Sequence, residues 1–242
     1  MPRFFVSNEQ ISHDEIRIMG EDGKHMATVL RSKIGDKVNV CNGESMDFVC
    51  SIQAIDKQEV LLRILSKEES ISEPKTKITL FQALPKSDKM ELIIQKCVEL
   101  GVDEIVPMET DFTIVKSNGK EDKKITRFQK ISEAAAKQSG RGKIPLIHPV
   151  ISFRKALDMA AMFDASILAY EKESETTLKA VIQRPSVQRM ACFVGAEGGF
   201  SDEEIVLCQA KQVQTVSLGK RILRTETAGF VLIANILYEW EG

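Results

Sequence analysis

The 242-residue sequence predicts an α/β domain preceded by a small β domain. Three features lead to this fold class. Short apolar runs separated by glycine turns fill residues 3–65, a pattern typical of a small barrel. Residues 66–76 are polar and charged and contain Pro74, which is the composition of a linker. From residue 77 onward, strand-like runs alternate with helical patterns, as in a parallel sheet covered by helices. We therefore expect one domain at residues 1–72 and a second at residues 73–242.

The first domain should consist mainly of short strands. The Asn42-Gly43 dipeptide between two apolar runs is a strong hairpin signal. One short helix is expected at residues 23–30. The strands are expected at residues 3–6, 37–41, 46–55 and 60–65.

The second domain should begin with a strand and then a helix that Ser87 caps and Gly101 ends. Ser201 has the position of another N-cap, because acidic residues follow it where carboxylates suit the helix dipole. Thr225 is the expected N-cap of the last helix. Strands are expected at residues 78–83, 104–108, 166–169, 190–194 and 213–217, and helices at residues 88–100, 123–139, 153–162, after residue 201, and at residues 226–238.

The composition excludes several classes of protein. A hydrophobic fraction of 43% and a charged fraction of 28% are ordinary for a soluble protein with a buried core. Residues 1–6 lack the apolar region of a signal peptide, and the apolar stretch 230–234 is too short to span a bilayer. The five cysteines form no C-x-x-C pair and favour reduced, buried thiols. We expect a cytoplasmic protein with no membrane segment and no metal site.

The charge is unevenly distributed along the chain. The net charge of −2 does not by itself favour nucleic-acid binding. Residues 116–143, however, hold nine basic and three acidic side chains. Such a cluster can follow a phosphate backbone, or it can be the solvated face of a helix. From charge alone, both interpretations remain open.

Two glycine-containing turns each follow an apolar run and precede a helical pattern, at residues 195–199 and 218–224. Glycine lets the backbone approach a ligand closely, and helix N-termini offer free N–H groups. At neighbouring strand ends of a parallel sheet, the two turns would form a crevice. Leu218, Ile222 and Leu223 could enclose a flat ring there. The dinucleotide-binding pattern G-x-G-x-x-G is absent, and two turns that serve only the fold are the alternative.

Several motifs in one order resemble a known family. They are KSDKME at 86–91, ELGV at 99–102, EAAAKQS at 133–139, GAEGGFS at 195–201 and LGKRILRTETA at 218–228. This series resembles the SPOUT methyltransferases, and within them the ribosomal-RNA uridine-N3 methyltransferases of the RsmE type. Three residues depart from the family pattern. Ala196 stands where proline is usual, Ser87 where glycine is common, and Phe112 where a basic residue is usual.

The resemblance implies a fold, a cofactor and an assembly. The fold is a small N-terminal PUA-like β-barrel that binds RNA, followed by a SPOUT α/β domain with a deep C-terminal trefoil knot. The assembly is a homodimer in which the partner chain completes each site. S-adenosylmethionine would be bound by three loops, mainly through backbone groups. The residues expected to bind it are Leu168, Ala169, Tyr170, Glu171, Val194, Gly195, Glu197, Gly198, Gly199, Leu218, Gly219, Ile222 and Leu223.

The implied reaction is methyl transfer to N3 of a uridine in small-subunit (16S) ribosomal RNA. That nitrogen carries a proton, so the enzyme must stabilise the uracil anion or supply a base. Arg224 is the candidate to hold a phosphate or a uracil oxygen. Glu226 is a candidate base or a partner that orients Arg224, and equally a carboxylate that only suits the first helical turn.

The substrate implied by the resemblance is ribosomal RNA or the small ribosomal subunit. Two other functions remain open. One is ribose 2′-O methylation of RNA within the same superfamily, and the other is a non-catalytic RNA-binding factor in ribosome assembly that kept the fold. The residues expected to contact RNA are Arg17, Arg31, Lys86, Lys116, Lys123, Lys124, Arg127, Arg141 and Lys143.

Overall fold

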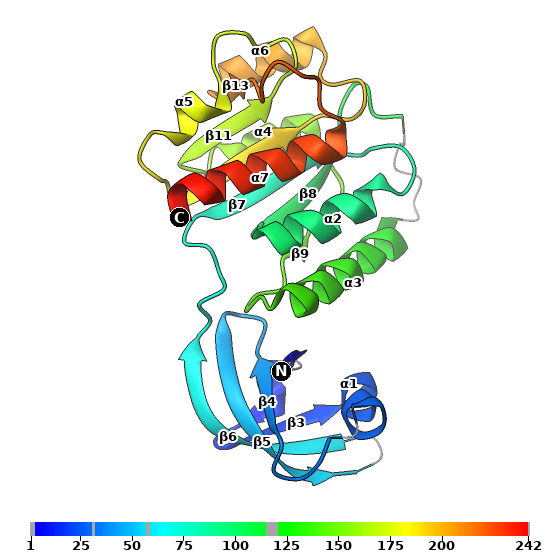
Figure 1. Cartoon of the computed structure of the whole chain (residues 1–242). Helices are drawn as coiled ribbons and strands as arrows, with labels where there is room; N and C mark the ends of the chain where they lie inside the picture. The colour runs from blue at the N-terminus through cyan, green and yellow to red at the C-terminus, as the bar shows by residue number, and fades with distance from the viewer. Residues whose placement is uncertain (1–2, 31, 57–58, 115–120, 242) are drawn as a thin grey trace. The chain divides into compact units, whose positions relative to one another are not determined.

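The computed structural model describes residues 3–30, 32–56, 59–114 and 121–241, and Figure 1 shows the course of the chain. The chain divides into two compact units. The first contains residues 1–73 and 136–144, and the second contains residues 74–135 and 145–242. Residues 136–144 therefore belong by their contacts to the first unit, although they follow the start of the second along the chain.

The first unit is a mainly antiparallel sheet whose described strands follow the order β1-β4-β5-β6-β3-β2. Its buried face gathers apolar residues from alternate strand positions, such as Ile16 and Ile18 of β3 and Val60 and Leu62 of β6, and Met26 packs against them. This period of two is what places one face of a strand in the core. The strands are β1 (Arg3–Phe5), β2 (Ile11–Ser12), β3 (Glu15–Met19), β4 (Lys37–Cys41), β5 (Met46–Ile55) and β6 (Glu59–Glu69), with helical turns at η1 (Asn8–Gln10), α1 (Gly20–Lys24) and η2 (His25–Val29).

Strands β4 and β5 have the predicted bounds, and the Asn42-Gly43 dipeptide lies in the turn between them. The predicted linker begins too early, because β6 continues to Glu69 in register with β5. The sequence reading missed β2 and β3. The alternation of Glu15, Ile16, Arg17 and Ile18 was an available signal for β3, since the two isoleucines are fully buried.

The segment 136–144 is held in the first unit by a buried ion pair. Arg141 Nη2 lies 2.6 Å from Glu73 Oε2, and both side chains are about 95% buried, with exposed fractions of 4% and 5%. The Gly142 backbone N–H donates to Glu73 Oε1 at 2.8 Å, and the Gly142 carbonyl accepts from the Ser45 N–H. Residues 141 and 142 of this glycine- and base-rich loop are therefore fixed by Glu73 and Ser45.

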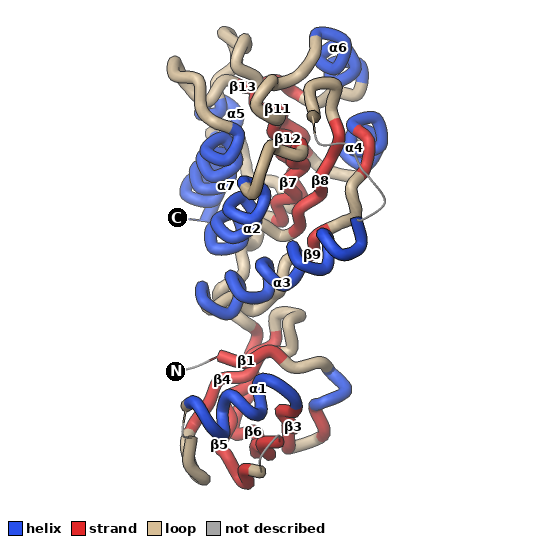
Figure 2. The backbone as a smooth tube through the Cα atoms, turned by 90° about the vertical axis from the view of Figure 1, so that its right-hand side faces the viewer, coloured by secondary structure: helices blue, strands red, loops and turns tan. Residues whose placement is uncertain are grey.

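The second unit is a parallel sheet with the order β10-β8-β7-β12-β11-β13 and β9 beside β8, as the alternating pattern predicted. Figure 2 shows helices α2 and α7 on one side of this sheet and α4 and α6 on the other. Stacked rings of Phe81 and Phe193, 4.5 Å between centroids, mark its core. The strands are β7 (Lys77–Ala83), β8 (Glu104–Glu109), β9 (Leu146–Ile147), β10 (Ile151–Ser152), β11 (Ala165–Ala169), β12 (Arg189–Val194) and β13 (Gln214–Val216), and the helices are α2 (Lys89–Leu100), α3 (Glu121–Ser139), α4 (Phe153–Ala160), α5 (Leu178–Ile182), α6 (Asp202–Ala210) and α7 (Thr225–Glu241).

Some helix ends lie where the sequence predicted them, and others do not. Ser201 caps α6 in a reciprocal capping box with Glu204, and Gly101 ends α2 with a left-handed φ of 107°. Asp88, not Ser87, precedes α2, and Ser87 has a positive φ of 57°. Thr225 is the first residue of α7 and not its N-cap, because its hydroxyl is used for contacts outside the helix.

Within the described residues, none of the helices is long and apolar enough to cross a membrane. The five cysteines are all buried and free of disulfides, as expected. The described part of the chain also has no cluster of three or more histidine, cysteine or carboxylate side chains able to hold a metal ion.

Candidate active site

Three loops meet at one edge of the parallel sheet and enclose a cavity of about 380 Å³. They follow the neighbouring strands β12, β11 and β13 at residues 195–199, 170–171 and 217–224. Because parallel strands point the same way, their carboxyl ends lie together, and this is where open α/β sheets bind ligands. The crevice predicted from the two glycine turns is present, and we refer to it as the first cavity.

Most of the residues expected to bind a cofactor line the first cavity, but two do not. Leu168 is fully buried in the sheet core, and Gly198 lies on the far side of its turn. Sequence reasoning missed seven lining residues. Lys89 comes from α2, Ser217 ends the predicted strand 213–217, and the other five come from the predicted turns or the start of α7. The expected residues on the wall are Ala169, Tyr170, Glu171, Val194, Gly195, Glu197, Gly199, Leu218, Gly219, Ile222, Leu223 and Arg224, and the missed ones are Lys89, Ala196, Ser217, Lys220, Arg221, Thr225 and Ala228.

The turn after β12 needs glycine at two positions. Gly199 has a φ of 70°, and a Cβ there would lie 2.9 Å from a carboxylate oxygen of Glu171. A Cβ on Gly195 would lie 3.0 Å from the backbone of Gly199. The positive φ at Gly199 disfavours any side chain, and a Cβ on Gly195 would press on the backbone of the turn itself, so tight closure of the turn depends on the two glycines.

A buried chain of hydrogen bonds joins this turn to the start of α7. The Thr225 hydroxyl donates to the carbonyl oxygen of Gly195 at 2.6 Å. The same hydroxyl accepts from Nε2 of Gln82 at 2.9 Å, and Gln82 also donates to the Ala83 carbonyl. Gln82 is fully buried and Thr225 nearly so. The turn at residues 195–199 and the start of α7, which are two walls of the first cavity, are thus fixed to each other and to β7.

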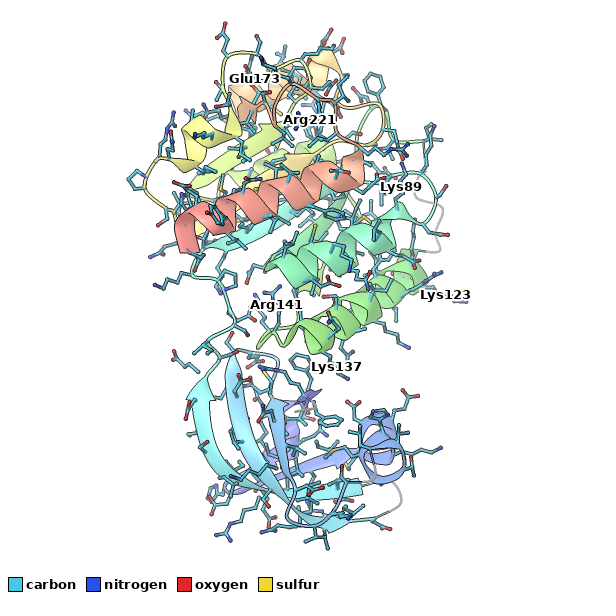
Figure 3. The ribbon with its side chains drawn as sticks, viewed as in Figure 1. Lys89, Lys123, Lys137, Arg141, Glu173 and Arg221 are labelled. Atoms are coloured by element: carbon cyan, nitrogen blue, oxygen red, sulfur yellow. The ribbon has the colours of Figure 1, made fainter. Side chains whose placement is uncertain are left out.

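A charged cluster of Lys89, Glu197 and Glu226 lies at the start of α2 and of α7. Figure 3 labels Lys89 at the start of α2. Lys89 Nζ lies 2.8 Å from Glu197 and 3.6 Å from Oε2 of Glu226. The hydrogen bond to Glu197 raises the pKa of Lys89, so the amine stays protonated. Burial raises the pKa of Glu197, but the Lys89 ammonium and backbone N–H groups outweigh it and leave that pKa below its usual range.

The two residues expected to be catalytic differ in their surroundings. Arg224 lines the first cavity, is exposed, and makes no ion pair or side-chain hydrogen bond with a described residue. Glu226 does not line this cavity, and its Oε2 is buried without a hydrogen-bond partner among the described residues. Among the described residues Glu226 forms an ion pair with Lys89, and no described contact joins it to Arg224. The geometry therefore gives no support to an orienting role of Glu226 toward Arg224.

A second cavity of about 570 Å³ lies beside the first and shares Glu197 with it. The loop after β8 supplies most of its wall. Phe112 there is 48% exposed, and a Cβ on Gly198 would lie 2.8 Å from the Cβ of Phe112. Gly198 therefore lets the phenylalanine lie against the turn. The lining residues are Lys86, Asp111, Phe112, Thr113, Ile114, Glu197 and Gly198.

The described residues that were expected to contact RNA differ in exposure and in their ion-pair partners. Arg141 is buried against Glu73, so its guanidinium is not placed to hold a phosphate. Arg31 and Lys116 lie outside the described residues. Lys86 lines the second cavity, and Lys143 is half-buried. Two of the arginines form ion pairs, Arg17 with Glu59 at 3.2 Å and Arg127 with Glu91 at 2.7 Å. Lys123 and Lys124 are exposed near the start of α3, and Figure 3 shows Lys123 pointing outward.

Comparison with known proteins points to one family. A family model described as an RNA methyltransferase domain matches residues 72–237, and one described as an RNA methyltransferase PUA domain matches residues 18–65. Ribosomal RNA small subunit methyltransferase E of Bacillus subtilis (strain 168) is 32% identical over 250 residues, covering 100% of this chain and 98% of the relative. The protein of the same name from Synechocystis sp. is 31% identical, covering 97% and 76%.

A solved structure extends this likeness to three dimensions. It is a ribosomal RNA small subunit methyltransferase E from Neisseria gonorrhoeae bound to S-adenosyl methionine. Its chain superposes with a TM-score of 0.89 at 29% identity, covering 99% of this chain and 98% of that one. The mixed α/β architecture with an N-terminal PUA-like domain is thus shared over the full length of both chains.

Proposed function

The chain belongs to the RNA methyltransferase family of the relatives named ribosomal RNA small subunit methyltransferase E, and from this membership we propose its reaction. It transfers a methyl group from S-adenosylmethionine to N3 of a uridine in small-subunit (16S) ribosomal RNA. The observation that carries the proposal is the first cavity, formed by three loops at adjacent strand ends in a chain that matches a cofactor-bound relative over its whole length.

The residues of the first cavity suit S-adenosylmethionine. The glycine turn offers backbone N–H and C=O groups, and a Cβ on Gly219 would meet nothing within 4 Å, so the wall there is open to a ligand. Ile222 is 85% exposed at the cavity, where a bound ligand would remove its apolar surface from water. The Glu171 and Glu197 carboxylates complement a sulfonium charge and sugar hydroxyls. We propose that these residues, with Leu218 and Leu223, hold the cofactor.

When bound, S-adenosylmethionine supplies an electrophilic methyl group, and the residues of this chain must prepare the uracil to receive it. The N3 proton has to leave before the nitrogen can attack. Glu226 is the proposed acceptor of that proton, supported by a buried carboxylate oxygen that lacks a hydrogen bond among the described residues. Lys89 is protonated and so is not the base; it stabilises the negative charge of both nearby glutamates.

Arg224 is the proposed partner of the uracil oxygen on which negative charge develops. Its guanidinium is exposed at the first cavity and is not engaged by a described acidic residue. A preorganised donor of this kind typically lowers the barrier by about 3 kcal/mol. Lysine should replace it poorly, because it lacks the planar fork of donors.

The proposed function extends to the closure of the first unit, the course of the chain after β13 and the assembly of the protein. We propose that the first unit closes as a β-barrel, that the chain after β13 forms a trefoil knot, and that the protein works as a cytoplasmic homodimer. The support for the knot is the bond between Thr225 and Gly195, which holds the start of α7 against the turn at residues 195–199. A partly exposed apolar stripe on α7 supports the dimer; it comprises Phe230, Val231, Ala234, Leu237 and Tyr238.

The test is methylation by the purified protein, with labelled S-adenosylmethionine and small subunits from a strain that lacks the gene. Nucleoside mass spectrometry should find N3-methyluridine. Arg224→Ala should lose roughly a hundredfold in turnover with cofactor affinity nearly intact, while Arg184→Ala, an exposed arginine after α5, should match the wild type. A 2′-O-methyl product would instead support ribose methylation. Cofactor binding without any RNA product would support an assembly factor.

A further inference from the structure

The second cavity presents an aromatic ring beside the proposed methylation site. Phe112 is 48% exposed and Ile114 is 67% exposed, although both are large apolar side chains. Exposed single apolar residues are common, but here two of them line one cavity that also contains Lys86 and Glu197. A flat apolar face with an adjacent cation is the combination that binds an unstacked nucleobase and its phosphate.

Hydrogen bonds fix the backbone turn that carries Phe112. The Thr110 backbone N–H donates to the hydroxyl of Thr113 at 2.9 Å, and the Thr113 N–H donates to the Thr110 carbonyl at 3.0 Å. Asp111 joins this turn to the start of α6, because its carboxylate accepts from the Ser201 hydroxyl and its N–H donates to Glu204. Phe112 is thus exposed on a preorganised turn. A ligand that stacks on Phe112 does not have to order the turn at residues 110–113 first.

The second cavity shares one wall residue with the first. Glu197 lines both, and it is also bonded to Lys89, whose other carboxylate neighbour is Glu226. The backbone N–H of Lys86 donates to the same Glu197 carboxylate at 3.3 Å. A planar group in the second cavity would therefore lie next to the charged cluster, with the cofactor on the other side of Glu197.

Resting on the proposed function, we propose that the second cavity is the subsite for the methyl-acceptor uracil. The uracil leaves the RNA stack and packs on the ring of Phe112, while Lys86 contacts its phosphate. Only a base turned out of its stack exposes the imide edge to a catalytic group, which is how enzymes that modify bases reach their targets. Phe112 is then a binding residue for the acceptor and not for the cofactor.

The subsite is tested by kinetics and by crosslinking on the full chain. Phe112→Ala should lower kcat/KM for RNA by roughly 5- to 150-fold, the range typical of one lost stacking partner, with unchanged S-adenosylmethionine affinity in calorimetry. Phe112→Tyr, which keeps the ring, should retain most of the activity. Val206→Ala removes a similarly exposed apolar side chain from α6 and is the matched control.

Crosslinking identifies which base lies on the ring. Short RNAs carry 5-iodouridine either at the mapped target or at one of its neighbours, and irradiation should join only the target base to Phe112. Crosslinks from a neighbouring base alone, or none at Phe112, would overturn the subsite while leaving the methylation proposal intact. A change in oligomeric state for Phe112→Ala would also overturn it and assign this surface to a second copy of the chain. A wild-type protein that makes no methylated RNA would instead overturn the proposed function.

Discussion

Replacing Thr225 by valine tests the buried link between the two halves of the cofactor cavity. Valine has nearly the same shape but no hydroxyl, so the carbonyl oxygen of Gly195 loses its donor and one N–H of Gln82 loses its acceptor. Both groups lie in buried surroundings, where an unsatisfied polar atom costs about 1–3 kcal/mol. Because Gln82 keeps its bond to the Ala83 carbonyl, we expect a total loss of about 2–4 kcal/mol in the free energy of unfolding.

The assay combines urea unfolding with calorimetry of S-adenosylmethionine binding. The urea midpoint should fall without a change in slope, and cofactor affinity should fall because the glycine turn and α7 are no longer held together. Thr227→Val is the matched control, since Thr227 is half-buried on the same helix and its hydroxyl has no hydrogen bond with a described residue. A Thr225→Val protein within about 0.5 kcal/mol of the wild type would refute the reasoning, because surface changes already fall in that range.

Three further predictions follow from other parts of the structure. Lys89→Met should leave Glu197 and Glu226 without their cation and reduce single-turnover methylation by roughly tenfold or more, whereas Lys89→Arg should restore part of the rate. Glu73→Gln should lower the free energy of unfolding by about 3 kcal/mol at neutral pH, because it leaves Arg141 buried without its carboxylate. The pKa of Glu73 is held low: burial opposes ionisation, but Arg141 and two backbone N–H groups outweigh it. The Glu73–Arg141 pair therefore stabilises the fold fully above pH 4.5, and this stabilisation is lost as the pH falls through the lower pKa that Glu73 has in the folded protein. In an acid titration, the difference in free energy of unfolding between the wild type and Glu73→Gln should disappear. Tyr238→Glu on the exposed stripe of α7 should shift the mass by light scattering from dimer to monomer, and a wild-type monomer at micromolar concentration would contradict the dimer.

Local sequence patterns were enough to predict most of the sheet in the second unit. Its longer strands are short apolar runs bounded by turn residues, and helices such as α2 and α4 carry clear apolar stripes, so these elements are specified by their own residues. The short elements β9, β10 and α5 were missed. The two glycine turns were also predictable, since positions such as Gly199 need a backbone that other residues rarely adopt. The first cavity follows from those turns once parallel strands bring them together.

The charged cluster was not predictable in the same way. Lys89, Glu197 and Glu226 lie far apart along the chain, and nothing in their local sequence indicates that they meet. The role of Thr225 was equally unpredictable from local sequence. A threonine before a helical pattern favours a capping role, but here its hydroxyl is directed to Gly195 because that bond closes the cavity wall. Such roles depend on tertiary packing and not on local pattern.

The distribution of basic residues shows why net charge along the sequence overstates the attraction for RNA. Of the basic residues at 116–143, Arg141 is neutralised by Glu73, Arg127 by Glu91 and Lys137 by Asp22. The exposed lysines near the start of α3 remain to contact phosphate, and each such contact contributes about one unit or less to the salt dependence of binding. Phosphate contacts position an RNA but do not select one nucleotide. The choice of uridine must therefore come from the residues beside the cofactor cavity, where a base can be read at its edge and on its face.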